Sequence, residues 1–475
     1  MNKPPTELTR SALTRAELIQ IMVGLGLAML LSALDQSIVA TAMPTIAADL
    51  GDFAHLPWIV TAYLVASTAV TPLYGKLADI HGARAMLLIG VATFVAGSIF
   101  CALAPSMSLL ALARGVQGLG GGGLIALAQT VIADLVAPRE RGRVMTYFSV
   151  VFIAASVGGP ALGGVFSEHL HWSLIFWINV PLGVLAFCMS WFHLGRVRQR
   201  RHPHRLDIAG ALLLVIGSSA TQLALSWGGE RYAWSSAPIL SLLAAAGAAW
   251  ALFAWRTRAA EEPLIPLAVL GDAVVRDATL SGAFGLGTFV ALSMFLPIYF
   301  EGALGLTADR SGLALIPLTV ATVAGATIAG RLMSRTRHYK AAPLVGLAAA
   351  TVAMAALWLW LDSLSLVALD ALLAVAGLGV GAMLPVTTVS VQNAVPAHNI
   401  GTATAVTQFS RQLGGVFIVA IFGAIVIGGG PSAAPAEPDT LRAAFRAALG
   451  IGALFLLASC LFLARMEERP LHGGE

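Results

Sequence analysis

Charge is what this sequence has least of. Only 11% of its 475 residues are Asp, Glu, Lys or Arg, whereas 58% are hydrophobic, and a soluble domain carries roughly 25% charged residues. The mean hydropathy is +0.83. A water-soluble fold of this size needs far more polar surface than such a composition supplies. The composition therefore excludes a soluble protein and indicates that lipid surrounds most of the chain.

Cysteine and the usual signatures of catalysis are also scarce. The three cysteines, Cys101, Cys188 and Cys460, are far apart in apolar runs, so they offer neither a disulfide framework nor a Cys-x-x-Cys metal site. The glycines at 120–123 lack the Lys-Ser/Thr that completes a phosphate-binding loop, and no Gly-x-Ser-x-Gly elbow marks a hydrolase. The ten histidines lie in loops or near the ends of apolar runs. We therefore expect no enzyme, no metal, no cofactor and no ATP site.

What the sequence has in abundance is apolar runs of the length that a membrane-spanning helix needs, about 20 residues. Such runs, separated by charged or turn residues, predict an all-α membrane protein. The fourteen runs cover 18–46, 57–76, 85–104, 108–133, 144–167, 174–194, 208–227, 236–255, 279–300, 310–333, 341–361, 364–391, 402–427 and 443–464.

The basic residues predict how these helices are oriented. If the N-terminus is cytoplasmic, the inner segments hold 22 of the 28 Lys and Arg residues and the outer loops hold 4, with Arg114 and Arg411 left inside spans. Basic residues collect on the cytoplasmic side of membrane proteins, so this count places both termini in the cytoplasm and supports an even number of spans. The net charge of +4 is then a topology signal, and no nucleic-acid partner is expected.

Two short stretches of weak sequence similarity between the halves of the chain indicate an internal repeat. The stretch 118–142 aligns with 377–401 at an offset of 259, and 75–77 aligns with 330–332 at an offset of 255. Both shifts correspond to eight spans, which divides the chain into six spans, an inserted pair and six more. Parallel repeats of this kind are typical of alternating-access carriers. The predicted units are a six-helix bundle at 1–196, the inserted pair with a basic linker at 197–262, and a second six-helix bundle at 263–475.

Two opposite charges lie at similar depth in the first six spans. At 1.5 Å per residue, Asp35 is about 16 Å from the outer end of its predicted span, and Arg114, about eight residues from the outer face, is about 12 Å deep. Charged side chains at this depth are expensive and mark function, and an arginine cannot lose its charge. Asp35 is therefore the predicted proton-coupling carboxyl, and Arg114 its partner. Two alternatives stay open. Asp35 makes a structural hydrogen bond or follows a helix that ends near Leu34, or Arg114 is satisfied by Gln117 and backbone carbonyls without any coupling.

Arg411 is the second intramembrane cation. Its candidate partners, Glu301 and Asp370, lie closer to the outer face, so no pairing follows. Either carboxyl could serve a cationic substrate or lie in an aqueous vestibule, and the vestibule is favoured. The predicted substrate cavity consists of Gln36, Gln117, Asn179, Arg411 and Glu301.

Charges and glycines border the predicted inner loops. Gly75 and Gly82 permit a tight turn and a close helix approach, and Asp79 can cap a helix end or bind a cation. A latch of such charges would hold two halves closed at the cytoplasmic side, although ordinary turns with topology-setting cations would look the same. The candidate gate residues are Gly75, Asp79, Gly82, Arg84, Asp134 and Arg143.

A stretch rich in glycine and proline lies inside the fifth span. Proline removes a helical hydrogen bond, and small residues let two helices touch closely. This pattern predicts a kinked, tightly packed helix face, which either seals a gate or serves packing alone. Its members are Gly159, Pro160, Gly163 and Gly164.

Several of these stretches resemble motifs of the major facilitator superfamily, in its fourteen-span drug:proton antiporter group. The string from Leu34 to Pro44 resembles L-D-x-T-I-V-N-V-A-L-P, and 75–84 resembles the G-x-L-A-D-R-x-G-R-K loop. The string from Arg114 to Gly118 resembles R-x-x-Q-G, and 159–164 resembles the antiporter motif. The segment 172–181 resembles W-R-W-I-F-W-I-N-V-P.

The resemblance implies the major facilitator fold and proton-driven export of amphipathic or cationic small molecules, with Asp35 and Arg114 in proton coupling. The partners it implies are a small-molecule substrate, protons and the lipid bilayer of the cell (inner) membrane, and we expect a monomer. Ile80, Ala83 and Ser173 stand where the motifs have basic residues. A weaker charge latch at the cytoplasmic side follows from these departures.

Two competing functions also fit these residues. One is a carrier of the same fold for a defined metabolite, lipid or siderophore, with or without proton coupling. The other is a membrane enzyme or a receptor that transports nothing, which predicts no substrate-dependent proton flux.

Overall fold

The computed structural model describes residues 14–52, 55–195, 205–229, 231–336, 338–427 and 438–471. Within these ranges the regular structure is helical, apart from an isolated bridge between Gly228 and Tyr232. The α-helices are α1 (Arg15–Leu50), α2 (Pro57–His81), α3 (Ala83–Ala102), α4 (Met107–Leu135), α5 (Pro138–His169), α6 (Leu174–Trp177), α7 (Asn179–Leu194), α8 (Ile208–Trp227), α9 (Ala237–Ala259), α10 (Leu267–Gly271), α11 (Ala273–Gly302), α12 (Ala308–Ala314), α13 (Ile316–Arg335), α14 (Ala341–Trp360), α15 (Leu366–Ala394), α16 (Ile400–Val426) and α17 (Pro438–Arg465). Short 3-10 helices, Leu361–Ser363 and Ala397–Asn399, precede α15 and α16.

In this part of the chain, 14 helical segments are long and apolar enough to cross a membrane, so the predicted all-α membrane fold is confirmed. Several helices extend beyond the predicted apolar runs. α1 continues through Pro44 to Leu50, because a proline removes one hydrogen bond without having to end the helix. The sixth and tenth runs are each divided, with short helices α6 and α12 before α7 and α13.

Side-chain caps fix the starts of several helices. The Thr14 hydroxyl accepts from the Glu17 amide at 3.3 Å, and the Glu17 carboxylate accepts from the Thr14 amide at 2.9 Å. Ser106 and Ser365 each accept a main-chain N–H from the first turn of α4 and α15. These bonds satisfy amides that a first turn leaves without partners. Ser106 and Ser365 are 259 residues apart, so the repeat extends to the helix caps.

The repeated glycines make equivalent contacts in the two halves. A Cβ atom at Gly118 or Gly122 of α4 would clash with carbonyl oxygens of α2. A Cβ atom at Gly377 or Gly381 of α15 would clash with carbonyl oxygens of α13 in the same way. Glycine is needed where two helix backbones come this close. The internal repeat is therefore present as a matching set of helix contacts.

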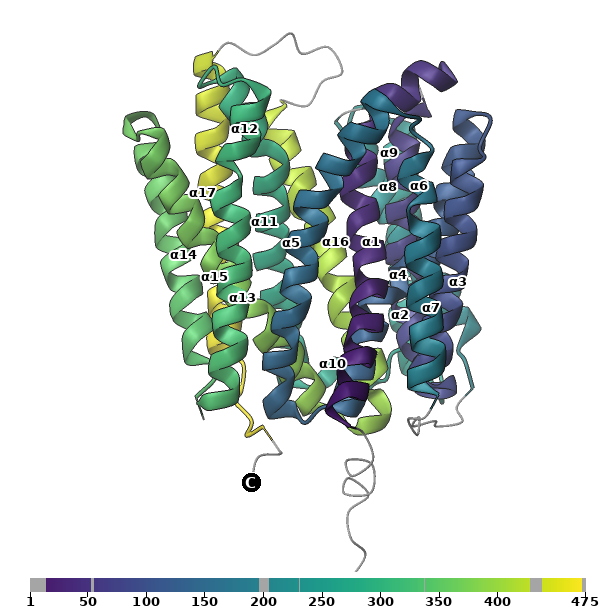
Figure 1. Cartoon of the computed structure of the whole chain (residues 1–475). Helices are drawn as coiled ribbons and strands as arrows, with labels where there is room; N and C mark the ends of the chain where they lie inside the picture. Colours follow the sequence, from purple (N-terminus) through teal and green to yellow (C-terminus); the bar gives the residue numbers. More distant parts are fainter. Residues whose placement is uncertain are drawn as a thin grey trace, which may run out of the picture.

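Helices α1 to α7 pack mainly on one another, as do α11 to α17, and Figure 1 shows these two bundles side by side. α8 and α9 pack together, and α8 contacts both α2 of the first bundle and α16 of the second. The start of α1 and the tail after α17 lie at the same side of the molecule, at the bottom of Figure 1. We call this the terminal side, and the opposite one the far side.

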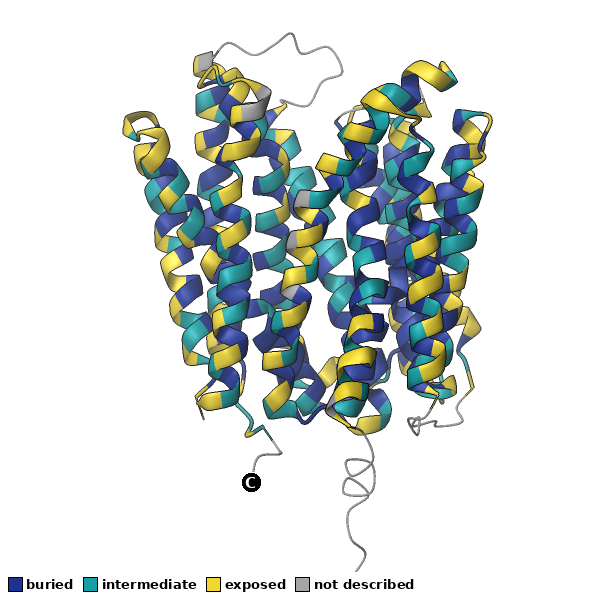
Figure 2. Cartoon of the chain, viewed as in Figure 1, coloured by how far each residue is buried: buried dark blue, intermediate teal, exposed yellow. Residues whose placement is uncertain are grey.

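Each bundle has its own buried core and an apolar outer surface. Figure 2 shows buried residues concentrated inside the bundles and exposed residues along their outer faces. Large apolar side chains such as Phe100, Leu112 and Val367 are exposed there, as lipid-facing helices require. The predicted unit boundary at 196–197 lies outside the described residues, and the one at 262–263 stays a prediction.

Candidate functional site

Asp35 lies inside the first bundle with hydrogen-bond donors around it. Its side chain is 0% exposed. Asp35 Oδ2 accepts from Arg114 Nη1 of α4 at 2.6 Å. Oδ1 accepts from Gln117 Nε2 of α4 at 2.8 Å and from Asn179 Nδ2 of α7 at 3.3 Å. Three helices therefore meet at one carboxylate, and the donors supply what a buried charge needs to be tolerated.

Arg114 is enclosed as well, and it has neutral partners besides Asp35. Its guanidinium donates to the Ile59 carbonyl of α2 at 3.0 Å and to Gln117 Oε1 at 2.5 Å. The guanidinium carbon lies 4.3 Å from the ring centre of Tyr63, which adds a cation–π attraction. Arginine keeps its proton in proteins. These neutral groups therefore stay available to Arg114 whichever form Asp35 takes.

Depth along the helices correctly predicted that Asp35 and Arg114 meet. The alternative, in which Gln117 and a backbone carbonyl satisfy Arg114, is also present in part, so the two sets of contacts coexist. The prediction that Gln117 and Asn179 line a substrate cavity is wrong. Both side chains are 0% exposed and bind Asp35 within the bundle.

Two further members of this network were missed because they belong to no motif. Ser98 Oγ of α3 accepts from Gln117 Nε2 at 2.8 Å and from Asn179 Nδ2 at 3.4 Å. The Tyr63 hydroxyl lies 3.2 Å from Ser32 Oγ. In the sequence, the only indication that these residues join the network is a hydroxyl group inside an apolar run. It does not by itself tell which of the many serines and tyrosines face the same interior point.

Arg411 is the buried cation of the second bundle, and its surroundings differ from those of Arg114. The side chain is 4% exposed. Nη1 donates to Thr388 Oγ1 at 3.1 Å, and Nη2 donates to Thr387 Oγ1 at 2.6 Å and to the Leu384 carbonyl at 3.4 Å. Nε is buried without an acceptor. Among the described residues, no carboxylate forms an ion pair with this guanidinium.

The other predicted cavity residues lie elsewhere. Gln36 is exposed and donates to the Ser32 carbonyl of its own helix at 3.2 Å. Glu301 is exposed at the end of α11, and Asp370 is half-buried near the start of α15. Neither carboxyl contacts Arg411, so the pairing that the sequence left open is not made in this structure.

Asp79 joins the two bundles at the terminal side. Its Oδ1 accepts from the Gly401 amide at 2.9 Å. Its Oδ2 accepts from the Thr402 amide at 2.8 Å and from the Thr402 hydroxyl at 2.6 Å. These amides belong to the first turn of α16, where the helix dipole favours a negative charge. Asp79 thus bridges the halves by capping a helix and not by an ion pair.

Close backbone crossings surround this bridge. A Cβ atom at Gly75 of α2 would clash with Ala405 of α16 and lie 2.6 Å from the Gly401 carbonyl oxygen. A Cβ atom at Gly330 of α13 would clash with the Gly142 carbonyl of α5. Gly75 pairs with Gly330 in the repeat, and Gly142 pairs with Gly401. The α2–α16 and α5–α13 crossings are therefore equivalent positions of one two-fold arrangement.

The hydrogen bonds between the bundles, as far as the described ranges show them, are confined to the terminal side. Besides those of Asp79, Arg139 Nε donates to the Ser334 carbonyl at 3.2 Å, and Gln392 Nε2 donates to the Gln129 carbonyl at 3.3 Å. The protein is therefore closed at the terminal side in this conformation.

The remaining predicted gate residues do not carry this closure. Arg84 donates to the Trp191 carbonyl at 2.7 Å, within the first bundle. Arg143 is exposed. Gly82, with φ of 96°, turns the chain between α2 and α3 in a conformation that favours glycine. Of the two partners that the sequence allowed for Asp79, a helix end and a cation, the bridge uses the helix end, and its bonds run to the main-chain amides of Gly401 and Thr402 and to the Thr402 hydroxyl. A latch of paired charges stays a prediction.

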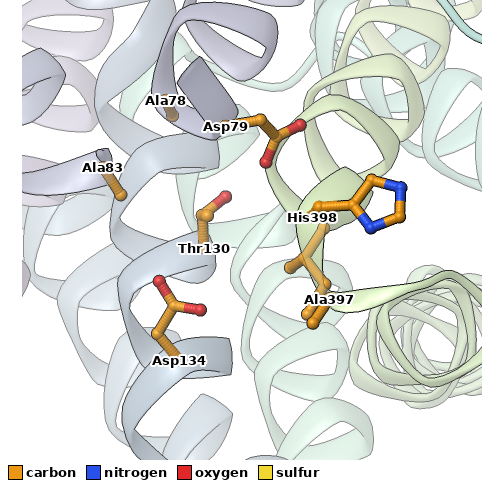
Figure 3. Close-up of a pocket in the computed structure, with 8 residues that line it drawn as sticks. Ala78, Asp79, Ala83, Thr130, Asp134, Ala397 and His398 are labelled. Atoms are coloured by element: carbon orange, nitrogen blue, oxygen red, sulfur yellow. The ribbon is translucent and has the colours of Figure 1, made fainter. Parts of the chain in front are cut away.

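A small pocket lies beside the bridge (Figure 3). Asp134, which the sequence grouped with the gate, lies on its wall together with Asp79. The second bundle contributes the 3-10 helix before α16. The lining residues are Ala78, Asp79, Ala83, Thr130, Asp134, Ala397, His398 and Ile400.

The glycines of the fifth span are divided between two faces of α5. A Cβ atom at Gly159 or Gly163 would clash with side chains of α1, so these two glycines let α5 and α1 pack closely. Gly164 has open space beside it, and Pro160 is exposed without ending the helix. The packing function is confirmed for Gly159 and Gly163, and a sealing function stays a prediction.

Comparison with known proteins identifies relatives over most of this chain. Residues 25–419 match the family model described as Major Facilitator Superfamily. The chain is 34% identical over 411 residues to the Multidrug transporter protein MdtP of Bacillus subtilis (strain 168), covering 86% of this chain and 75% of that protein. It is 33% identical over 408 residues to Multidrug resistance protein 3 of the same organism, covering 85% and 79%. Its fold resembles that of a bacterial homologue of the iron transporter ferroportin in an outward-facing state, with a TM-score of 0.67 at 14% identity, covering 96% and 100%.

Proposed function

Because the chain belongs to the major facilitator superfamily, we propose that it exports amphipathic small molecules in exchange for protons. The family and the spanning helices make it a transporter and not an enzyme. Proton exchange, direction and cargo are the proposed part. The observation that carries the proposal is the buried carboxylate of Asp35, held by Arg114 inside the first bundle.

Asp35 is suited to proton exchange because its charge decides how Arg114 is held. As a carboxylate it binds Arg114 and accepts from Gln117 and Asn179. A proton on Asp35 removes the negative charge and weakens the charge-assisted bond. Arg114 then keeps the Ile59 carbonyl and Gln117 Oε1 as acceptors. Proton uptake therefore loosens the link between α1 and α4, which changes how the bundle packs.

Alternating access requires the bundles to part at one side as they close at the other. In our proposal the terminal side is cytoplasmic, as the basic residues predict, so the closed terminal side makes this the outward-facing state in a bacterial-type plasma membrane. The return step breaks the bonds of Asp79 with Gly401 and Thr402. The proton gradient supplies the drive, since each proton crossing 100 mV releases about 2.3 kcal/mol, and no cofactor or ATP takes part.

Proton coupling is tested with purified protein in proteoliposomes under an imposed pH gradient, using a panel of amphipathic dyes. Wild type is expected to accumulate dye against its gradient. Asp35→Asn is expected to lose accumulation and keep downhill exchange, because the amide preserves size but takes up no proton. Asp370→Asn, which changes a half-buried carboxyl near a helix end, is the control and is expected to match wild type.

An Asp35→Asn protein that still accumulates dye would overturn the coupling role. A wild-type protein that carries one metabolite, lipid or siderophore without moving protons would instead favour the uncoupled carrier.

A further inference from the structure

Arg411 is a buried cation that the proposed proton site does not explain. Its acceptors are the hydroxyls of Thr387 and Thr388 and the carbonyl of Leu384, all of them neutral. Its Nε is buried without a partner. An arginine at membrane depth cannot shed its charge, and a buried charge without a counter-charge is strongly unfavourable. Such a group indicates a partner that is present during only part of the working cycle.

The buried charges deep within the described spans have an excess of positive sign. Three charged side chains that are both buried and at least about two helical turns from either helix end are Asp35, Arg114 and Arg411. With Asp35 ionised these three sum to one positive charge, and with Asp35 protonated they sum to two. The middle of these spans is therefore positive in both protonation states of Asp35.

We propose that Arg411 selects the charge of the cargo, so that the exported molecules carry a carboxylate or another anionic group and permanent cations are disfavoured. The inference rests on the proposed export function and specifies its substrate class. At an effective dielectric constant of about 20, a unit charge about 8 Å away changes the affinity for a charged ligand by about thirtyfold, in favour of the opposite sign. Arg411 therefore acts on cargo even before direct contact.

The position of Arg411 connects it to the moving part of the molecule. It lies on α16, the helix that the first bundle holds through Asp79 and Gly75. Its Nε faces α11 at Gly282, where a Cβ atom would lie 2.8 Å away. The glycine leaves room for the guanidinium beside α11. When the bundles part at the terminal side, the contacts of α16 with α2 and α4 change, whereas the partners of Arg411 on α15 and α11 stay within its own bundle.

The test uses three amphiphiles with one aromatic skeleton that ends in a carboxylate, a methyl ester or a trimethylammonium group. Transport is measured in proteoliposomes under a pH gradient. Wild type is expected to prefer the carboxylate over the trimethylammonium compound by about tenfold or more. Arg411→Gln is expected to lower carboxylate transport by about tenfold and to raise trimethylammonium transport, with the ester within about twofold of wild type.

Two further variants separate charge from shape. Arg411→Lys keeps the charge and is expected to keep the wild-type order of preference. Arg331→Gln removes the same charge from an exposed position near the end of α13 and is expected to leave all three rates near wild type. The ester rate shows in each case that the protein is folded and working.

A wild-type protein that prefers the trimethylammonium compound would overturn the inference whatever the variants do. An Arg411→Gln protein in which all three rates fall together would also overturn it, since that is what a purely structural arginine predicts. Failure of the proposed export function looks different, because then none of the three compounds accumulates in response to the pH gradient.

Discussion

A buried arginine in a membrane helix needs acceptors, and the two bundles supply them differently. Arg114 has a carboxylate at 2.6 Å and the ring of Tyr63 beside it, whereas Arg411 has two hydroxyls and a carbonyl. The positive charge of Arg114 is balanced by Asp35, whose negative charge a proton can neutralise. The positive charge of Arg411 has no negative partner among the described residues. In our proposals these two side chains therefore respond to different partners, Arg114 to the protonation of Asp35 and Arg411 to an anionic group on the cargo.

The balance between Asp35 and Arg114 predicts the stability of their variants. Asp35→Asn leaves Arg114 buried without a counter-charge, and Arg114→Gln leaves Asp35 buried without a counter-charge. Each variant is expected to destabilise the protein by about 3–5 kcal/mol. The double variant removes both charges and is expected to lose much less than the sum of the two. Thermal unfolding in detergent, read as a double-mutant cycle, measures the coupling.

Asp439→Asn is the control for this cycle, because Asp439 is 92% exposed in its pair with Arg442 and such pairs contribute only about 0–1 kcal/mol. Strict additivity of the Asp35 and Arg114 variants would show that the two charges do not stabilise each other.

Depth along a helix was enough to bring Asp35 and Arg114 together, but it does not tell which way a side chain faces. Gln117 and Asn179 looked like cavity residues for this reason, although both turn inward to Asp35. The partner of Asp79 was hidden for another reason. It consists of two main-chain amides at the start of α16 and the Thr402 hydroxyl, and the sequence does not show which helix start lies opposite Asp79.

At the scale of helices, closure depends on how near two backbones can come. The repeat in the sequence correctly indicated two equivalent halves, and its glycines Gly75, Gly142, Gly330 and Gly401 lie where the bundles cross. Side chains at these points would keep α2 from α16 and α5 from α13. Asp79 adds a directional bond to one of the two crossings. The crossings thus set how tightly the terminal side closes.

Gly75→Ala is expected to disfavour the closed terminal side. The added Cβ would meet Ala405 and the Gly401 carbonyl, and overpacking of this kind costs about 1–3 kcal/mol. The amides of Gly401 and Thr402 hydrogen-bond to Asp79, so parting of the bundles frees them. Hydrogen exchange of the start of α16 should therefore become faster in the variant. Gly247→Ala on α9, where a Cβ meets open space, serves as the control, and equal exchange in the two variants would contradict the prediction.

At the scale of the whole molecule, the inserted pair α8–α9 bridges the seam between the bundles. Trp250 of α9 lies 6.3 Å from Phe409 of α16, measured between ring centres. Both belong to an apolar cluster that also includes Leu73 of α2. Nearer the far side, Trp227 of α8 lies 5.3 Å from Trp58 of α2. The sequence indicated that the pair is an insertion but did not indicate where it packs. Apolar side chains pack against many kinds of apolar surface, so the sequence of an apolar helix does not identify its neighbour.

This geometry predicts that the pair moves with the first bundle. α8 contacts α2 more extensively than it contacts α16, and the Trp58–Trp227 pair joins α8 to α2 outside the cluster that contains Phe409. Parting of the bundles at the terminal side should therefore separate Trp250 from Phe409 and leave Trp58 with Trp227. A short bifunctional thiol reagent tests this with the pairs Trp250→Cys/Phe409→Cys and Trp58→Cys/Trp227→Cys.

Both pairs are placed in a background without the native thiols of Cys101, Cys188 and Cys460. Cross-linking the Trp250–Phe409 pair is expected to stop transport, because it ties the inserted pair to both bundles, and reversal of the link should restore it. Cross-linking the Trp58–Trp227 pair joins elements that move together and is expected to leave transport near the uncross-linked rate. Transport that continues with Trp250 linked to Phe409 would mean that α8–α9 follows the second bundle, and the seam would then have to open along α2.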